Sequence, residues 1–281
     1  GLQPHLLTMT ATPIPRTLAL TLHGDLDVSQ LDELPPGRTP VNTQLISPKD
    51  KHYAYDLIRN EIKQGHQIYV VLPLIEESEK LQLSSAVDVY HQLSTEIFSD
   101  FTVELLHGKM KSVEKQEVIQ NFLNKKIDIL VSTTVIEVGV DVPNASVMLI
   151  EDSDHFGLAQ LHQLRGRVGR GASKSYCLLS YQNKNKLSRQ RLEVLVNSND
   201  GFEISEIDLR FRGPGQVLGT KQSGLPDFAL ASLADDADVL ELARDEARNI
   251  LDSDPVLRSN SMLRLLIKEQ WEKLKIANKL N

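Results

Sequence analysis

Residues 127–150 read IDILVSTTVIEVGVDVPNASVMLI, and this stretch decides the fold class. Two short apolar runs, 127–132 and 146–150, enclose a segment that contains Gly139 and Pro143. Each run is too short for a helix and contains β-branched residues, which is typical of buried strands. The sequence therefore predicts two strands, the first of which leads into an irregular segment.

The same alternation extends through residues 41–179. Further strands are predicted at 41–46, 67–72, 102–106 and 175–180, and helices at 50–63, 85–97, 111–123 and 158–164. Short strands that alternate with helices predict an α/β fold, in which helices cover both faces of a parallel sheet. Within 111–123, one apolar face is predicted to hold Val113, Val118, Ile119 and Phe122. Ligands of such sheets bind beyond the carboxyl ends of the strands.

The flanking regions have a different pattern. A short strand at 5–9, a helix from Ile14 and a proline–glycine linker at 34–40 cannot bury a core of their own. After residue 182 the predicted elements are helices, at 186–196, 204–211, 236–251 and 261–277. The expected organisation is residues 1–40 as the end of one unit with a linker, 41–182 as the α/β domain, and 183–281 as a mainly helical region.

Composition narrows the function classes. The 281 residues are 41% hydrophobic with a net charge of −7, and no apolar run approaches the ~18 residues of a membrane span. A single cysteine, Cys177, excludes an internal disulfide and a cysteine-rich zinc site, so a reduced, cytoplasmic setting is expected. The eight histidines are scattered, and no metal site is predicted. No nucleophile–base pair points to a small-molecule enzyme of the α/β class.

One basic segment lies between two acidic regions. Residues 160–224 hold 11 Lys/Arg against 5 Asp/Glu, and they include QLRGRVGRG at 163–171. Arg165, Arg167 and Arg170 are not all expected to be buried, because an unpaired buried charge is very costly. The planar guanidinium group suits a transferring phosphoryl group, and the interleaved glycines favour close approach of a phosphate. A solvated basic helix end is the alternative interpretation.

Three other segments contain residues suited to phosphate chemistry. They are TATPIPRT at 10–17, STTVIEVGVDVPN at 132–144 and FRGPGQVLGTKQSG at 211–224. In the second, the hydroxyls of Thr133 and Thr134 suit phosphate oxygens, Gly139 allows a ligand close to the backbone, and Asp141 suits a ribose hydroxyl. Taken alone, each segment also fits a capped helix start, a strand-to-loop transition or a surface loop.

Taken in order, these four segments resemble motifs III, V and VI of superfamily 2 helicase motors, followed by a translocation motif. Residues 10–38 and 201–224 further resemble the RecG family of bacterial branched-DNA translocases. The resemblance spans residues 5 to 230 and implies a RecA-like second motor lobe. It also implies ATP-dependent translocation on double-stranded DNA and remodelling of stalled forks and Holliday junctions in recombination and repair. A cytoplasmic, nucleoid-associated monomer that contacts no membrane is expected.

The resemblance also implies residue roles. Arg167 and Arg170 would be arginine fingers, and Gly139, Asp141 and Gln163 would lie on the nucleotide side. It implies DNA contacts for His107, Lys109, Thr133 and Thr134. It implies coupling and translocation roles for Thr10, Thr12, Glu137, Arg191, Arg212 and Gln222.

Two expected motor motifs are absent from this sequence. It contains no GxxxxGK[ST] loop, and Asp32-Glu33 lies in the linker rather than at the end of a strand. ATP and Mg²⁺ would therefore be held mainly by a first motor lobe. That lobe and an N-terminal wedge domain are the expected partners of this chain. The chain alone is expected to be inactive as an ATPase. A transcription-repair coupling factor-type translocase and a non-catalytic nucleic-acid or protein-binding module remain the alternatives.

Overall fold

The computed structural model describes the chain in several ranges. These are residues 7, 9, 10, 12, 29, 31, 33, 38–73, 79–133, 142–171, 174–182, 185–212 and 237–277. The chain divides into two compact units, residues 1–13 with 32–208 and residues 14–31 with 209–281. The first unit contains the sheet and most of the predicted site residues.

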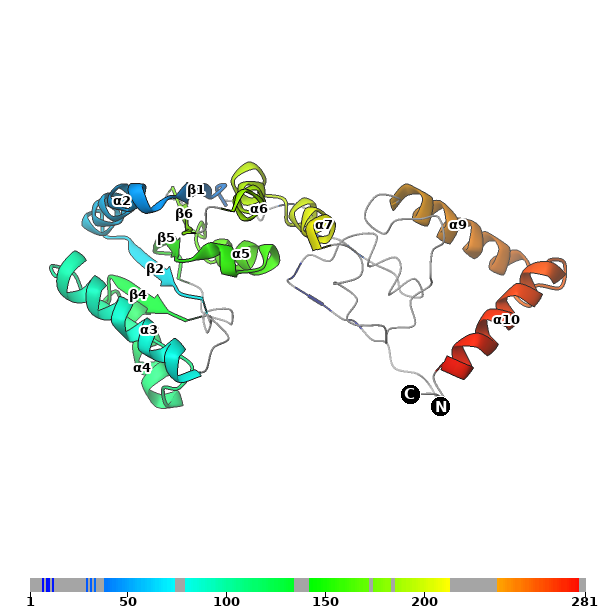
Figure 1. Cartoon of the computed structure of the whole chain (residues 1–281), viewed down its shortest axis with the longest axis horizontal. Helices are drawn as coiled ribbons and strands as arrows, with labels where there is room; N and C mark the ends of the chain where they lie inside the picture. Colours follow the sequence, from blue (N-terminus) through cyan, green and yellow to red (C-terminus); the bar gives the residue numbers. More distant parts are fainter. Residues whose placement is uncertain are drawn as a thin grey trace. The chain divides into compact units, whose positions relative to one another are not determined.

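A six-stranded sheet forms the centre of the first unit (Figure 1). Its strands are β1 (Asn42–Ile46), β2 (Gln67–Val71), β3 (Val103–Leu106), β4 (Ile129–Ser132), β5 (Ala145–Ile150) and β6 (Tyr176–Ser180). Their order is β1-β6-β5-β2-β4-β3, and every neighbouring pair is parallel. The six strands predicted between residues 41 and 180 and the parallel α/β fold are confirmed.

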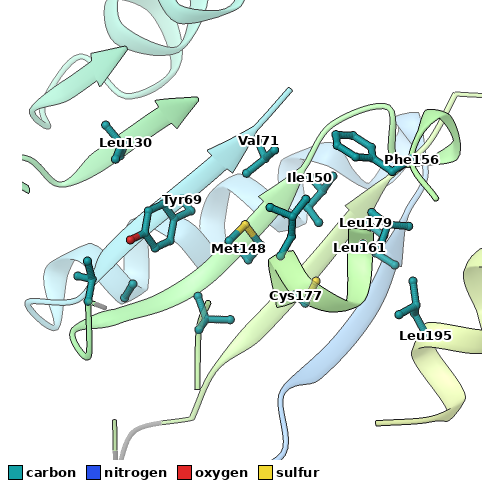
Figure 2. Packing of buried hydrophobic residues seen from close by; sticks show 14 of the residues in the cluster. Tyr69, Val71, Leu130, Met148, Ile150, Phe156, Leu161, Cys177, Leu179 and Leu195 are labelled. Atoms are coloured by element: carbon teal, nitrogen blue, oxygen red, sulfur yellow. The ribbon is translucent and has the colours of Figure 1, made fainter. Parts of the chain in front are cut away.

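Helices cover both faces of the sheet. Side chains alternate along each strand, so each strand contributes residues to a core on either face. On β2, Tyr69 and Val71 belong to one core, which includes residues from α4 (Ser112–Leu123), α5 (Leu158–Arg165) and α6 (Lys186–Asn197). Figure 2 shows the strand residues of this core beside Leu161 and Leu195. Ile68 and Val70 belong to the other core, with residues from α2 (Lys51–Lys63) and α3 (Glu79–Gln92).

The apolar face predicted for the helix at 111–123 is wrong for one residue, Val113. Phe122 is buried in the first core, and Val118 and Ile119 pack against that core, but Val113 is 74% exposed. A helix turns about 100° per residue, so the nine positions between Val113 and Phe122 place them on roughly opposite sides of α4. Val113 therefore belongs to the solvent face of the helix.

The predicted helix at 85–97 differs in extent and in its last turn. It begins earlier, as α3, and continues as a π-helical turn, η2 (Leu93–Ile97). Arg59 of α2 donates from Nη2 to the carbonyl of Ile97 at 2.8 Å, and its guanidinium lies 5.3 Å from the centre of the Phe98 ring. This arginine thus provides a donor for a carbonyl at the end of the turn.

The remaining predicted helices are present. They are α7 (Gly201–Arg212), α9 (Ala237–Ser253) and α10 (Ser261–Ala277). Between α9 and α10, the carboxylate of Asp254 accepts from the backbone N–H groups of Arg258 at 2.8 Å and Ser259 at 2.7 Å. The backbone bond from Arg258, followed by those from Ser259 and Asn260, lowers the pKa of Asp254 despite the opposing effect of desolvation.

Some predicted elements lie wholly or mostly outside the described residues. These are the strand at 5–9, the helix from Ile14 and the glycine-rich stretch at 213–224. Within the described ranges, none of the helices has the length and apolar character needed to cross a membrane.

Candidate functional site

The carboxyl ends of β3 and β4 lie side by side and bring together two predicted DNA-contacting residues. Leu106 pairs with Ser132 in the sheet register, and the backbone N–H of Thr133 donates to the carbonyl of Leu106 at 3.3 Å. His107 follows Leu106 directly, so it lies next to Thr133 at this edge. Thr133 is only 5% exposed, whereas Lys109 is exposed.

The loop after β3 carries positive charge around a neutral imidazole. Burial lowers the pKa of His107, and the nearby ammonium groups of Lys115 and Lys109 lower it further against the opposing effect of Glu114. Lys115 of α4 donates from Nζ to the carbonyl of Gly108 at 2.6 Å. Lys109 and Lys115 are therefore the cationic groups that lower the pKa of His107, which favours the uncharged imidazole.

The three arginines at and after the end of α5 have different environments. Arg165 is 3% exposed, whereas Arg167 and Arg170 are partly exposed. Nε of Arg170 donates to the carbonyl of Gly166 at 3.1 Å, and this hydrogen bond orients the Arg170 side chain. The expectation that the three would not all be buried is confirmed. The two partly exposed side chains are the ones predicted to be arginine fingers.

Arg165 is held by neutral acceptors. Nη1 donates to the carbonyls of Leu195 and Ser198, each at 2.8 Å, and lies 3.4 Å from Oγ1 of Thr43. Nη2 lies 2.9 Å from Nδ1 of His162. Burial, together with the charge of Arg165, lowers the pKa of His162 to about 4 against a smaller opposing effect of Asp200, so the neutral ring can accept this bond.

The glycines of the arginine segment allow the protein to pack against itself. Gly169 has φ +77°, and a Cβ atom there would lie 2.8 Å from Cγ2 of Val41. At Gly171 a Cβ atom would lie 2.7 Å from the carbonyl oxygen of Pro143. At these two glycines, the chain's own atoms therefore fill the space that a Cβ atom would need. A close phosphate contact at this segment stays a prediction.

Replacing Gly169 with alanine is expected to lower the free energy of unfolding by about 1–3 kcal/mol, because a left-handed backbone and a steric clash are combined there. Gly166→Ala is the matched control. Its Cβ atom would lie no closer than 3.4 Å to another atom, the carbonyl oxygen of Gln163. Urea titration of both variants measures the difference; equal stability would contradict the packing role of Gly169.

A hydrogen bond joins two motifs that lie far apart in the sequence. Nε2 of Gln163 on α5 donates to Oγ1 of Thr12 at 2.5 Å, across 151 positions. The backbone N–H of Thr12 in turn donates to Oγ1 of Thr10 at 3.2 Å. The structure therefore connects the segment that precedes the α/β domain to the helix that leads into the arginines.

Arg191 of α6 holds the turn that precedes α5. Its Nη2 donates to the carbonyls of Asp154 and Phe156, each at 2.8 Å, in and after the short helix η4 (Ser153–His155). Five of the predicted site residues lie outside the described residues, namely Thr134, Glu137, Gly139, Asp141 and Gln222. Arg212 is the last residue of α7, and its side chain is not described.

An ion pair at the carboxyl end of β5 was missed by sequence reasoning. Nζ of Lys51 lies 3.0 Å from Oε2 of Glu151, which is 7% exposed. Burial lowers the pKa of Lys51, but the charge and hydrogen bond of Glu151, together with Tyr55 and Asp152, outweigh this effect and raise the pKa overall. The available signal was the position of Glu151 directly after a predicted strand, where charged groups gather at the functional edge.

Two family models match the chain. Residues 51–172 match the helicase conserved C-terminal domain, and residues 198–281 match the C-terminal part of domain 3 of the ATP-dependent DNA helicase RecG. The ATP-dependent DNA helicase RecG of Synechocystis is 58% identical over 98% of this chain. The chain belongs to the RecG family.

Other RecG proteins agree with this assignment. The ATP-dependent DNA helicase RecG of Aquifex aeolicus is 49% identical over 99% of the chain. A solved structure of RecG bound to a three-way DNA junction matches with a TM-score of 0.65 and 47% identity, over 82% of this chain and 30% of that one. The chain spans about a third of the length of these RecG relatives, 33% for Synechocystis and 36% for Aquifex aeolicus.

Proposed function

We propose that this chain is part of a longer ATP-dependent motor that moves along double-stranded DNA and remodels branched DNA, such as stalled forks and Holliday junctions. The observation that carries this proposal is the 58% identity to a RecG protein over 98% of the chain. In this proposal residues 1–40 are the end of motor lobe 1 and its linker, and 41–182 are motor lobe 2. Residues 183–281 then carry the translocation hairpin and terminal helices.

The proposed nucleotide side is the end of α5. Arg167 and Arg170 are partly exposed there, as arginines that reach ATP held by another lobe must be. ATP would supply the phosphoryl group whose developing charge these two guanidinium groups stabilise. Gln163 would report nucleotide state to Thr12 through their hydrogen bond. Gly139 and Asp141 complete this side in our proposal, and we assign Mg²⁺ no ligand among the described residues.

The proposed DNA side is the edge formed by the ends of β3 and β4. His107 and Thr133 lie together there, and Lys109 supplies an exposed positive charge that suits a phosphate backbone. Thr134 is assigned to the same contact. Coupling to movement is assigned to Thr10, Thr12, Glu137, Arg191, Arg212 and Gln222. The proposed setting is the bacterial cytoplasm at the nucleoid, as a monomer with its own first motor lobe and wedge domain.

ATP turnover tests this proposal directly. The full-length protein is expected to hydrolyse ATP with stimulation by a three-way junction or a forked duplex, and this chain alone is expected to show no turnover. DNA-stimulated turnover by the chain alone would contradict the division of the site between two lobes. Absence of turnover in the full-length protein would favour the alternative that it is a non-catalytic binding module. Displacement of stalled RNA polymerase would instead indicate a transcription-repair coupling factor.

A further inference from the structure

The guanidinium group of Arg165 lies at the junction between α6 and α7. Its two shortest bonds from Nη1, each 2.8 Å, reach the carbonyl of Leu195 in the last turn of α6 and the carbonyl of Ser198 just after that helix. Among the described residues, its hydrogen-bond partners are all uncharged oxygens or a ring nitrogen. The arginine thus binds the end of a neighbouring helix rather than an acidic side chain.

This arrangement has a clear physical reason. The last carbonyls of a helix have no partners within it and carry partial negative charge, so a buried cation with several donors stabilises them. At 3% exposure, Arg165 itself is tolerable only when it is fully hydrogen-bonded. Removing it would leave two carbonyls at the α6–α7 junction without these donors. The bond pair therefore links the end of α5 directly to the α6–α7 junction.

The two ends of this connection belong to different parts of the proposed motor. On one side, Arg165 is the last residue of α5 and lies two positions before Arg167. On the other side, Ser198 and Asp200 lie just before α7, and Oδ1 of Asp200 accepts from the N–H of Phe202 in the first turn of that helix at 2.8 Å. Helix α7 leads to Arg212 and the segment 213–224 that resembles the translocation motif.

We propose that Arg165 is a positioning residue that transmits movement of the arginine-finger segment to α7 through its bonds to the carbonyls of Leu195 and Ser198. This inference rests on the proposed motor function. Arg165 is then dispensable for hydrolysis and required for converting hydrolysis into movement. Its side chain needs no contact with nucleotide or DNA for this role, in agreement with its burial.

The test compares ATP hydrolysis with unwinding of a forked duplex by the full-length protein. Arg165→Met is expected to keep DNA-stimulated ATP turnover within about twofold and to reduce base pairs unwound per ATP by about tenfold, a typical size for coupling between sites. Arg165→Gln keeps amide donors for the two carbonyls, and it is expected to recover a large part of the unwinding per ATP. Because it keeps donors for the buried carbonyls, this variant also tests the proposal if Arg165→Met fails to fold.

Two controls separate transmission from general damage. Arg189→Met makes the same substitution on α6, where the side chain is 60% exposed and pairs with Glu193, and it is expected to leave both activities unchanged. Leu192→Ala creates a buried defect in α6 and is expected to lower the melting temperature without lowering unwinding per ATP. If Arg165→Met lowers hydrolysis and unwinding in proportion, or changes neither, the inference is wrong. If the unmodified protein neither hydrolyses ATP nor unwinds DNA, the proposed function itself fails.

Discussion

Replacing Arg170 with alanine in the full-length protein is expected to reduce ATP turnover by a factor of about 10³ or more, the size typical of an arginine finger. The guanidinium group would stabilise charge that develops on the transferring phosphoryl group, so the loss falls on the rate of hydrolysis. Nucleotide affinity is expected to change little, because the phosphate-binding loop would belong to the other lobe. Steady-state turnover and equilibrium binding of a labelled nucleotide measure the two quantities.

A matched control exists on α6. Arg189→Ala removes an arginine whose side chain is 60% exposed, and it is expected to leave turnover within a factor of about two, as surface substitutions usually do. If Arg170→Ala hydrolyses ATP at the normal rate, Arg170 is not a finger. A loss of nucleotide binding equal to the loss of turnover would place Arg170 in ground-state binding instead.

Replacing Phe122 with alanine is expected to lower the free energy of unfolding by about 3–5 kcal/mol, the usual cost of deleting a buried aromatic ring. The ring is 1% exposed and lies 5.0 Å from that of Tyr69 on the central strand β2. Such a loss is a large fraction of the stability of an ordinary domain. Urea titration followed by circular dichroism gives the difference.

Val113→Ala on the same helix provides the comparison. Val113 is 74% exposed, so its replacement is expected to change the free energy of unfolding by less than about 0.5 kcal/mol. This pair also tests which residues form the apolar face of α4. Comparable losses from the two variants would mean that the buried face of the helix is not the one described above.

Strands and helices of the α/β domain could be predicted because each has a strong local pattern. The runs 67–72 and 146–150 are short and apolar, and they became β2 and β5 with all their residues buried. The prediction that Val113 belongs to the apolar face of its helix is wrong, because a valine is equally apolar on either side of a helix. The rotation of the helix over the nine positions between Val113 and Phe122 shows that the Val113 side chain faces solvent. The prediction of one apolar face for all four residues did not take this rotation into account.

The sequence predicts which residues belong to the candidate site, and the structure shows which other residues they contact. Nothing in QLRGRVGRG distinguishes Arg165 from Arg167, since burial depends on α6, which is distant in sequence. The bond between Gln163 and Thr12 spans 151 positions and could not be read from either motif alone. Likewise, the sequence of this segment does not reveal that Gly169 lies against Val41 or that Gly171 lies against Pro143.

Because Thr12 contacts Gln163, the residues that form the sheet and the residues that make this contact have different boundaries along the chain. A shortened chain that starts at residue 38 retains every strand of the sheet and both cores. It lacks the threonine hydroxyl that receives the Gln163 amide. In the proposed motor, such a piece would lack one partner of the nucleotide-reporting bond, so nucleotide binding measured on it would not include the effect of that contact.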